Sequence, residues 1–269
     1  MSTDLRSVFG LNTTPFTREI PHDQMIVFPM QQEALDGMHR AVERRMSAAF
    51  IAPAGTGKTS LVRLLSTQLP EARYRVHYVK ITDLSKRDMC REIACVCGVP
   101  PAGSYPSLVR RLQTRFEGSV GDDGVRPVLI LDDAQDLRPD VLSILRVITN
   151  YQMDSRLVLS VILAGQPPLK KLLASEEHEA VARRMAHYAS VRPLSRDETT
   201  TYIEHRLAVA GVSRSPFDKA SADAIYKISR GNLRVIDSLA LESLETAARA
   251  GLKVVSAQHV ATARRGLYP

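Results

Sequence analysis

Residues 52–59, APAGTGKT, have the composition and spacing of a loop that binds phosphate groups, with Ala52 where such loops usually begin with glycine. Gly55 and Gly57 permit backbone angles that are closed to other residues, so successive N–H groups can turn toward one anion. The lysine that follows reaches the β- and γ-phosphates of a nucleoside triphosphate, and the next hydroxyl is a ligand for Mg²⁺. We therefore expect ATP and Mg²⁺ to bind at Ala54, Gly55, Thr56, Gly57, Lys58, Thr59 and Ser60.

A second motif, VLILDDAQD at residues 128–136, is an apolar run that ends in two acids. A buried strand of this kind delivers side chains to its C-terminal edge. There we expect Asp132 to hold the Mg²⁺ and Asp133 to orient and activate the attacking water. Glutamate is usual at the second position, and aspartate is one methylene shorter. We therefore predict ATP hydrolysis that is slow or depends on assembly; the alternative is a strand end with two solvated acids.

Both motifs need a sheet edge that brings them together. Short apolar runs predict buried strands at residues 48–52, 74–81, 128–132 and 156–165. Helical patterns stand around and between them, at residues 31–46, 59–69, 85–98, 105–116 and 139–152. Strands that alternate with helices in this way predict an α/β fold whose parallel sheet is covered on both faces.

The pattern changes near Pro193 and Leu194. Beyond this point only helices are predicted, at residues 195–211, 218–229, 232–250 and 256–266. We expect an ATPase α/β domain at residues 31–193, a small all-helical lid domain at residues 194–269, and an N-terminal segment, residues 1–30, near the nucleotide pocket.

The chain resembles a known family in several segments taken together. They are the phosphate loop, LILDDAQ, VILAGQPPL, VRPLSRDETTTYIEHRL, ISRGNLRVID and the opening FGLNTTPF. This combination resembles the AAA+ ATPases of the ExeA/GspA-like group, whose relatives include transposition helper ATPases of the Mu B and TnsC kind. The resemblance covers nearly the whole chain. It implies a P-loop parallel sheet of the AAA+ type, flanked by helices and followed by a helical lid.

The resemblance also implies roles for four further residues. Gln166 occupies the position of the polar sensor beside the γ-phosphate, and Arg234 that of the lid arginine that reaches the nucleotide. Arg183 or Arg184 lies where such ATPases project an arginine into a neighbour's site, which would couple hydrolysis to self-association in a ring or filament. The alternatives are a turn-capping glutamine, structural ion pairs and an ordinary arginine on a helix surface.

Composition gives weaker constraints on partners and location. Lys and Arg number 36 against 29 Asp and Glu, a net charge of +7 that favours polyanionic partners. Trp is absent, which argues against a binder of single strands. The three cysteines, within CREIACVCG, are expected to be helix-packed thiols rather than metal ligands. The chain shows no signal-peptide pattern and no membrane-length apolar run, so we expect a cytoplasmic protein with no membrane partner.

Basic residues cluster in two predicted helices and at the C-terminus. Lys86 and Arg87 begin one helix, and Arg110 and Arg111, with Arg115, lie on the next. Such side chains bind the backbone of duplex DNA without reading sequence, although each alone is more often a solvated surface charge. Secretion-linked members of the family carry a membrane span after the ATPase, whereas this sequence stops after its helices. We therefore favour a helper that recruits a transposase, over an ATPase for secretion or pilus assembly or a nucleotide-gated switch.

Overall fold

The computed structural model describes residues 5–17, 19–121, 124–153 and 156–267. The chain forms two compact units. The sheet unit comprises residues 29–53 and 58–191, and the helical unit combines residues 1–28, 54–57 and 192–269. Among the described helices, each is too short or too polar to cross a lipid bilayer.

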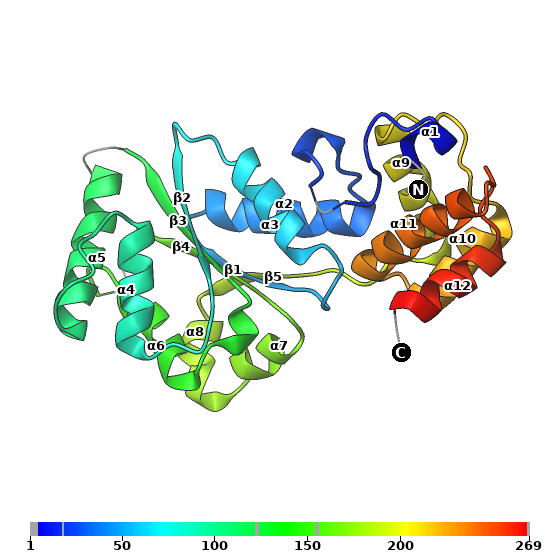
Figure 1. Cartoon of the computed structure of the whole chain (residues 1–269). Helices are drawn as coiled ribbons and strands as arrows, with labels where there is room; N and C mark the ends of the chain where they lie inside the picture. The colour runs from blue at the N-terminus through cyan, green and yellow to red at the C-terminus, as the bar shows by residue number, and fades with distance from the viewer. Residues whose placement is uncertain (1–4, 18, 122–123, 154–155, 268–269) are drawn as a thin grey trace. The chain divides into compact units, whose positions relative to one another are not determined.

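In the described part of the chain, five parallel strands form one sheet in the order β2-β3-β4-β1-β5 (Figure 1). They are β1 (Ser47–Ile51), β2 (Tyr74–Lys80), β3 (Arg126–Asp132), β4 (Ser160–Gly165) and β5 (Met185–Ser190). The predicted parallel α/β sheet is thus confirmed. Parallel strands end at one common edge, so the residues after β1, β3 and β4 gather there.

Helices cover both faces of the sheet. The helices α2 (Pro29–Glu43) and α3 (Lys58–Gln68) pack on one face, against β1 and its neighbours. The other face is covered by α4 (Lys86–Val96), α5 (Tyr105–Gly121) and α6 (Pro139–Ile148). Shorter elements follow: the 3₁₀ turns Ala134–Asp136 and Glu176–His178, and the helices α7 (Pro168–Leu173) and α8 (Glu179–Ala182).

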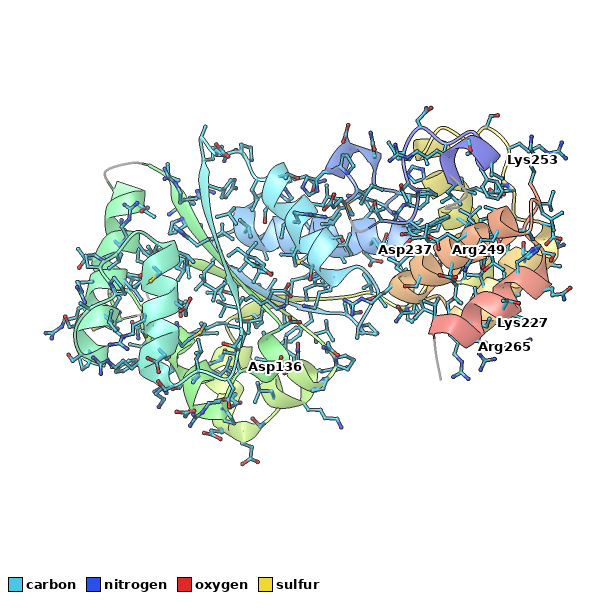
Figure 2. The ribbon with its side chains drawn as sticks, viewed as in Figure 1. Asp136, Lys227, Asp237, Arg249, Lys253 and Arg265 are labelled. Carbon is cyan, nitrogen blue, oxygen red and sulfur yellow. The ribbon has the colours of Figure 1, made fainter. Side chains whose placement is uncertain are left out.

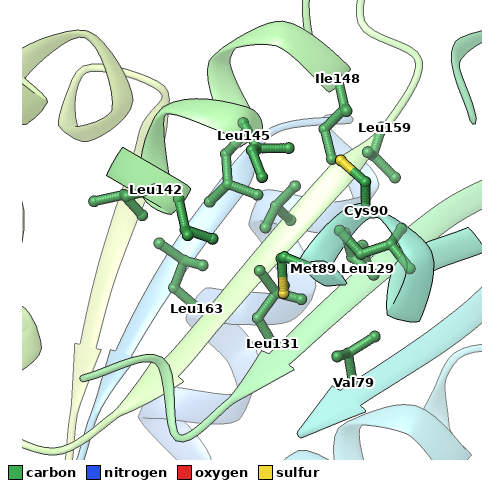
Figure 3. Close-up of a cluster of buried hydrophobic side chains, with 14 of the residues drawn as sticks. Val79, Met89, Cys90, Leu129, Leu131, Leu142, Leu145, Ile148, Leu159 and Leu163 are labelled. Atoms are coloured by element: carbon green, nitrogen blue, oxygen red, sulfur yellow. The ribbon is translucent and has the colours of Figure 1, made fainter. Parts of the chain in front are cut away.

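The hydrophobic core between the sheet and the helices α4, α5 and α6 fixes the position of the strands (Figure 3). Leu129 and Leu131 of β3 are fully buried there, beside Met89 and Cys90 of α4. Burying one such leucine stabilises the fold by roughly 1.5–3 kcal/mol. Cys90 and Cys97 are buried, as expected for packed thiols, whereas Cys95 is exposed.

The sequence pattern does not predict β5. This strand is the outermost strand on the β1 side of the sheet, and only Met185 and Ala189 of its six residues are buried. An edge strand with one solvated face lacks the continuous apolar run that identifies a central strand. Its place beside β1 therefore comes from tertiary pairing rather than from local pattern.

The main helices in the described part of the helical unit are α9 (Arg196–Val209), α10 (Lys219–Ser229), α11 (Leu233–Arg249) and α12 (Ala257–Leu267). Each lies within two residues of its predicted range. The first three begin at side-chain caps, of which Ser195 forms a full capping box with Glu198. The unit also includes α1 (Leu5–Phe9) and the 3₁₀ turn His22–Gln24.

A buried arginine of α9 attaches the N-terminal segment to this unit. The Arg206 guanidinium donates to the Thr17 carbonyl at 2.6 Å and to the Asp237 carboxylate at 3.2 Å. It also lies over the ring of Phe16 and donates to the Tyr202 hydroxyl at 2.6 Å. Because Arg206 is only 5% exposed, these partners must satisfy its charge and its donors.

Asp237, labelled in Figure 2, makes the stability of this network dependent on pH. Burial raises its pKa to about 6 from the ordinary 3.8, despite the charge of Arg206 and the donation from Tyr202. The folded state therefore binds this proton more tightly than the unfolded state, so stability falls as pH rises from about 4 to 6.

We predict that Asp237→Asn removes this loss, because the amide still accepts hydrogen bonds and carries no charge. Relative to the variant, the wild-type chain should lose up to about 3 kcal/mol of unfolding free energy between pH 4 and pH 7. Urea unfolding at several pH values measures the difference. Parallel pH profiles for the two proteins would show that folding does not shift the pKa of Asp237.

Candidate nucleotide-binding site

The site is built on Asp132, the last residue of β3, which accepts four hydrogen bonds. Its Oδ1 accepts from Lys58 Nζ and from the backbone N–H of Asp133, the latter at 2.9 Å. Its Oδ2 accepts from the Thr59 hydroxyl at 2.9 Å and the Tyr78 hydroxyl at 3.0 Å. Asp132 is 1% exposed and Lys58 is 8% exposed. The structure thus brings the two sequence motifs into direct contact.

These donors keep Asp132 ionised. Burial alone would raise its pKa, but the hydrogen bond and charge of Lys58, with the Asp133 N–H and the Thr59 hydroxyl, outweigh burial and hold the pKa below its usual value. The carboxylate is therefore anionic at neutral pH, as a ligand of a divalent cation must be.

The oxygen atoms at this edge fit Mg²⁺. The Thr59 hydroxyl and the Asp132 carboxylate are hard oxygen donors within hydrogen-bond distance of each other, and Mg²⁺ is bound by one or two such groups with substrate phosphates. Thr59 lies in the first turn of α3, an 11-residue helix whose free N–H groups and dipole favour an anion. A bound Mg²⁺ would supply positive charge for the phosphates here.

Asp133 has a left-handed backbone, with φ of 57°, which aspartate tolerates better than most residues. Its Oδ1 lies 2.9 Å from Lys58 Nζ, and its Oδ2 lies 3.8 Å from Lys80 Nζ. The carboxylate is thus turned into the site although Asp is shorter than Glu. While it is paired with Lys58, the Asp133 carboxylate is a poor base. It would accept a proton from water only if Lys58 were bound to another anion.

Three further residues around the acids were not identified from the sequence. Tyr78 and Lys80 project from β2 toward the acids, because His77 and Val79 face the core on the other side of this strand. Gln135 accepts the Gln166 backbone N–H at 2.9 Å, which joins the turn after β3 to the end of β4. Strand alternation was the available signal for Tyr78 and Lys80, but it does not say which face meets the site.

The glycines of the phosphate loop have the expected conformations, with φ of 76° at Gly55 and 86° at Gly57. Residues 54–57 pack with the helical unit. There Asn232 donates to the Ala54 carbonyl at 2.7 Å, and a Cβ on Gly55 would collide with the Asn232 side chain. Asn232 was also missed; it is the cap residue of α11 in the segment GNLR.

The remaining predicted residues occupy three places. Arg234 has an exposed side chain, and its backbone N–H donates to the Gly55 carbonyl at 3.3 Å. Gln166 directly follows β4, at the sheet edge that carries Asp132. Arg183 and Arg184 precede β5 and so lie at the opposite edge. The structure therefore does not bring these two arginines to the acids of their own chain.

Two of the basic residues predicted to contact DNA are bonded to the same loop. Arg87 donates to the Gly103 carbonyl at 3.1 Å, and Arg111 donates to the Ala102 carbonyl. Lys86 begins α4 and is half-buried, while Arg110 is exposed on α5. The helices α4 and α5 pack together, so these residues form one basic region.

Comparison with known proteins supports a nucleotide-binding site at these residues. Residues 40–173 match the AAA domain family, a stretch that includes Lys58, Thr59 and both acids. The solved structure of Aeropyrum pernix ORC1 in complex with DNA is similar, with a TM-score of 0.67 and 20% identity over 92% of this chain and 68% of that one. The protein has the AAA+ fold. The match to this family supports nucleotide binding at this site.

Other AAA+ structures are similar to the same extent. Cdc6p from Pyrobaculum aerophilum has a TM-score of 0.70 at 18% identity, over 97% of this chain and 70% of that one. The Thermotoga maritima RuvB Holliday junction branch migration motor has a TM-score of 0.62 at 18% identity, over 94% and 73%. At these identities the likeness is one of fold.

A curated relative is general secretion pathway protein A of Aeromonas hydrophila, 28% identical over 251 residues. The match includes 92% of this chain but 46% of the relative, so the chain spans about half the length of that protein.

We predict that Tyr78→Phe weakens the Mg²⁺-dependent part of nucleotide binding by about tenfold, because a hydrogen bond that orients a metal-binding carboxylate typically contributes about 10- to 100-fold in affinity. ADP binding in EDTA should not change. Calorimetric titration with and without Mg²⁺ measures both values, and Tyr74→Phe on the same strand is the control. Equal losses in the two conditions would instead indicate a general structural defect.

Proposed function

We propose that this chain is an ATPase that binds ATP with Mg²⁺, self-associates in a ring or filament, and contacts duplex DNA to select targets and recruit a transposase. The observation that carries the nucleotide part is the contact of Lys58 and Thr59 with Asp132 at the end of β3. In this proposal Lys58 binds the phosphates, Thr59 and Asp132 hold Mg²⁺, and Asp133 activates water. Gln166 and Arg234 sense the nucleotide, and Arg183 or Arg184 acts on a neighbouring chain.

Two observations support DNA as the partner. The net charge is +7, and basic side chains are exposed in both units. In the helical unit Lys227, Arg249, Lys253 and Arg265 are exposed on or beside α10, α11 and α12 (Figure 2). In addition, similar folds belong to a protein solved with DNA and to a branch migration motor. Basic side chains of this kind bind phosphates without reading sequence.

A second function is favoured by the sequence relative. The 28% identity with a general secretion pathway protein over most of this chain supports an ATPase that acts on protein assembly. The nucleotide chemistry is the same in both proposals. They differ in the partner, so DNA binding separates them.

Asp133→Asn should bind ATP but lose about 100-fold or more in turnover, because an amide cannot take a proton from water. Asp133→Glu tests the reach of the side chain, and it should turn over at least as fast as the wild type. Phosphate release measures turnover, and fluorescence titration with a nucleotide analogue measures binding. Normal turnover by the Asn variant would mean that another group activates the water.

Co-sedimentation with duplex DNA in the presence and absence of ATP tests the partner. We expect DNA to sediment with the protein only when ATP is present. Lys58→Ala should abolish this co-sedimentation in ATP, because the variant lacks phosphate binding. Sedimentation that ignores nucleotide, or DNA that stays in the supernatant while ATP is still hydrolysed, would favour the secretion function.

The double substitution Lys86→Ala with Arg87→Ala should weaken DNA binding equally for all sequences. It should also reduce the slope of log K against log salt by up to about 2, since each lost phosphate contact changes the slope by about 0.9. Lys170→Ala with Lys171→Ala, an exposed pair on α7, is the matched control. An unchanged slope would exclude the start of α4 from the DNA contact.

A further inference from the structure

A groove in the helical unit lies between α9 and α10, two helices that pack against each other (Figure 1). Its volume is about 500 Å³, within the range of about 300–1,000 Å³ that is usual for binding sites. The buried side chains of Ile203, Phe217 and Ala222 line it. The groove therefore has an apolar floor with room for several side chains of a partner.

The floor is held in place by residues outside the groove. The Phe217 ring packs edge-on against the ring of Phe16, with 6.3 Å between the ring centroids. The backbone of Phe217 also pairs with Val255 in an isolated β-bridge. A floor that is already ordered lowers the entropy cost of binding, because few side chains must be fixed when a ligand arrives.

The rim of the groove is acidic. Four carboxylates and two cations line it: Asp197, Glu204, Asp218, Asp223, Arg196 and Lys219. Arg196 of α9 pairs with Asp223 of α10 at 2.5 Å, and Asp218 caps α10. Within the described residues, the carboxylates of Asp197 and Glu204 have no ion-pair or hydrogen-bond partner. Two anionic groups are thus left for a ligand, on a chain whose net charge is +7.

The two acids lie on the same side of α9. Asp197 and Glu204 are seven residues apart, close to two turns of the helix, so their side chains point in similar directions. At 1.5 Å per residue they are about 10 Å apart along the helix axis. Both are exposed at the rim. One ligand with cationic groups about this far apart can pair with both acids at once.

We propose that this groove binds a short basic segment of a partner protein, in which apolar side chains between lysines or arginines contact the floor. The acidic rim repels the phosphates of DNA and of anionic lipids, whereas it attracts lysine and arginine side chains. The net charge of the whole chain does not attract a basic segment, so such binding depends on the groove itself. The proposal goes beyond the proposed function and requires neither ATP nor DNA.

The first experiment uses a fluorescently labelled peptide, GRKLLKRG, and the full chain without nucleotide. Asp197→Asn with Glu204→Gln should weaken peptide binding by about fivefold, because two exposed ion pairs are lost. Glu176→Gln with Glu177→Gln, at exposed positions in the sheet unit, changes the net charge equally and is the control. Fluorescence anisotropy measures the affinity, and thermal unfolding of each variant verifies that it is folded.

Lys219→Gln tests the groove in the opposite direction. Lys219 is exposed in the first turn of α10, where a cation opposes the helix dipole, so its loss should not harm the helix. Removing this cation from the rim should tighten binding of GRKLLKRG by about twofold. A damaged fold would not give tighter binding, so this variant separates a local charge effect from misfolding.

A second peptide, GRKSSKRG, tests the apolar floor. It keeps every charge of the first peptide and replaces the two leucines with serines. It should bind at least about tenfold more weakly, because it has no apolar side chain to bury against the floor.

The proposal is overturned if the groove substitutions change peptide affinity no more than the control does, or if GRKSSKRG binds as tightly as GRKLLKRG. It is also overturned if Asp197→Asn with Glu204→Gln alters the sedimentation of the free protein, because a second copy would then cover the groove. Failure of the proposed function looks different. A chain that neither hydrolyses ATP nor sediments with DNA, but binds GRKLLKRG through the groove, keeps the docking surface and loses the DNA-dependent ATPase role.

Discussion

The buried carboxylate of Asp132 is the constraint around which the sheet unit is arranged. A charge that is 1% exposed is tolerated only when donors surround it, and here they come from three elements: α3, β2 and the chain after β3. All of these donors must lie beside the C-terminal end of β3. The apolar contacts of β3 with α4 and α6 fix the position of that strand, so the core determines the geometry of a polar site.

The interactions of Lys58 relate this arrangement to function. Its ammonium group is shared between Asp132 and Asp133, the two acids with proposed chemical roles. In the proposed function, binding of a phosphate by this ammonium group would weaken its pairing with the acids. Asp133 would then be free to accept a proton from water, and Asp132 would keep its other three donors. The hydrogen bonds from Thr59 and Tyr78 would therefore be needed most to stabilise the Asp132 carboxylate when Lys58 is bound to a phosphate. Removing Lys58 would leave the exposed Lys80, 3.8 Å from Asp133 Oδ2, as the nearest described counter-charge for the two acids, so Lys58 also has a structural role.

The sequence was sufficient where local pattern and function coincide. Gly55 and Gly57, the acids after an apolar run and the helical patterns of α9 to α11 are local signals, and the structure has these elements as expected. Tyr78, Lys80 and Asn232 were missed because their roles depend on which strand face or which helix end meets the site. The basic residues show a related limit. Arg87 and Arg111 count as surface charge in the sequence, yet both donate to carbonyls of one loop, so part of their hydrogen-bonding capacity is already used.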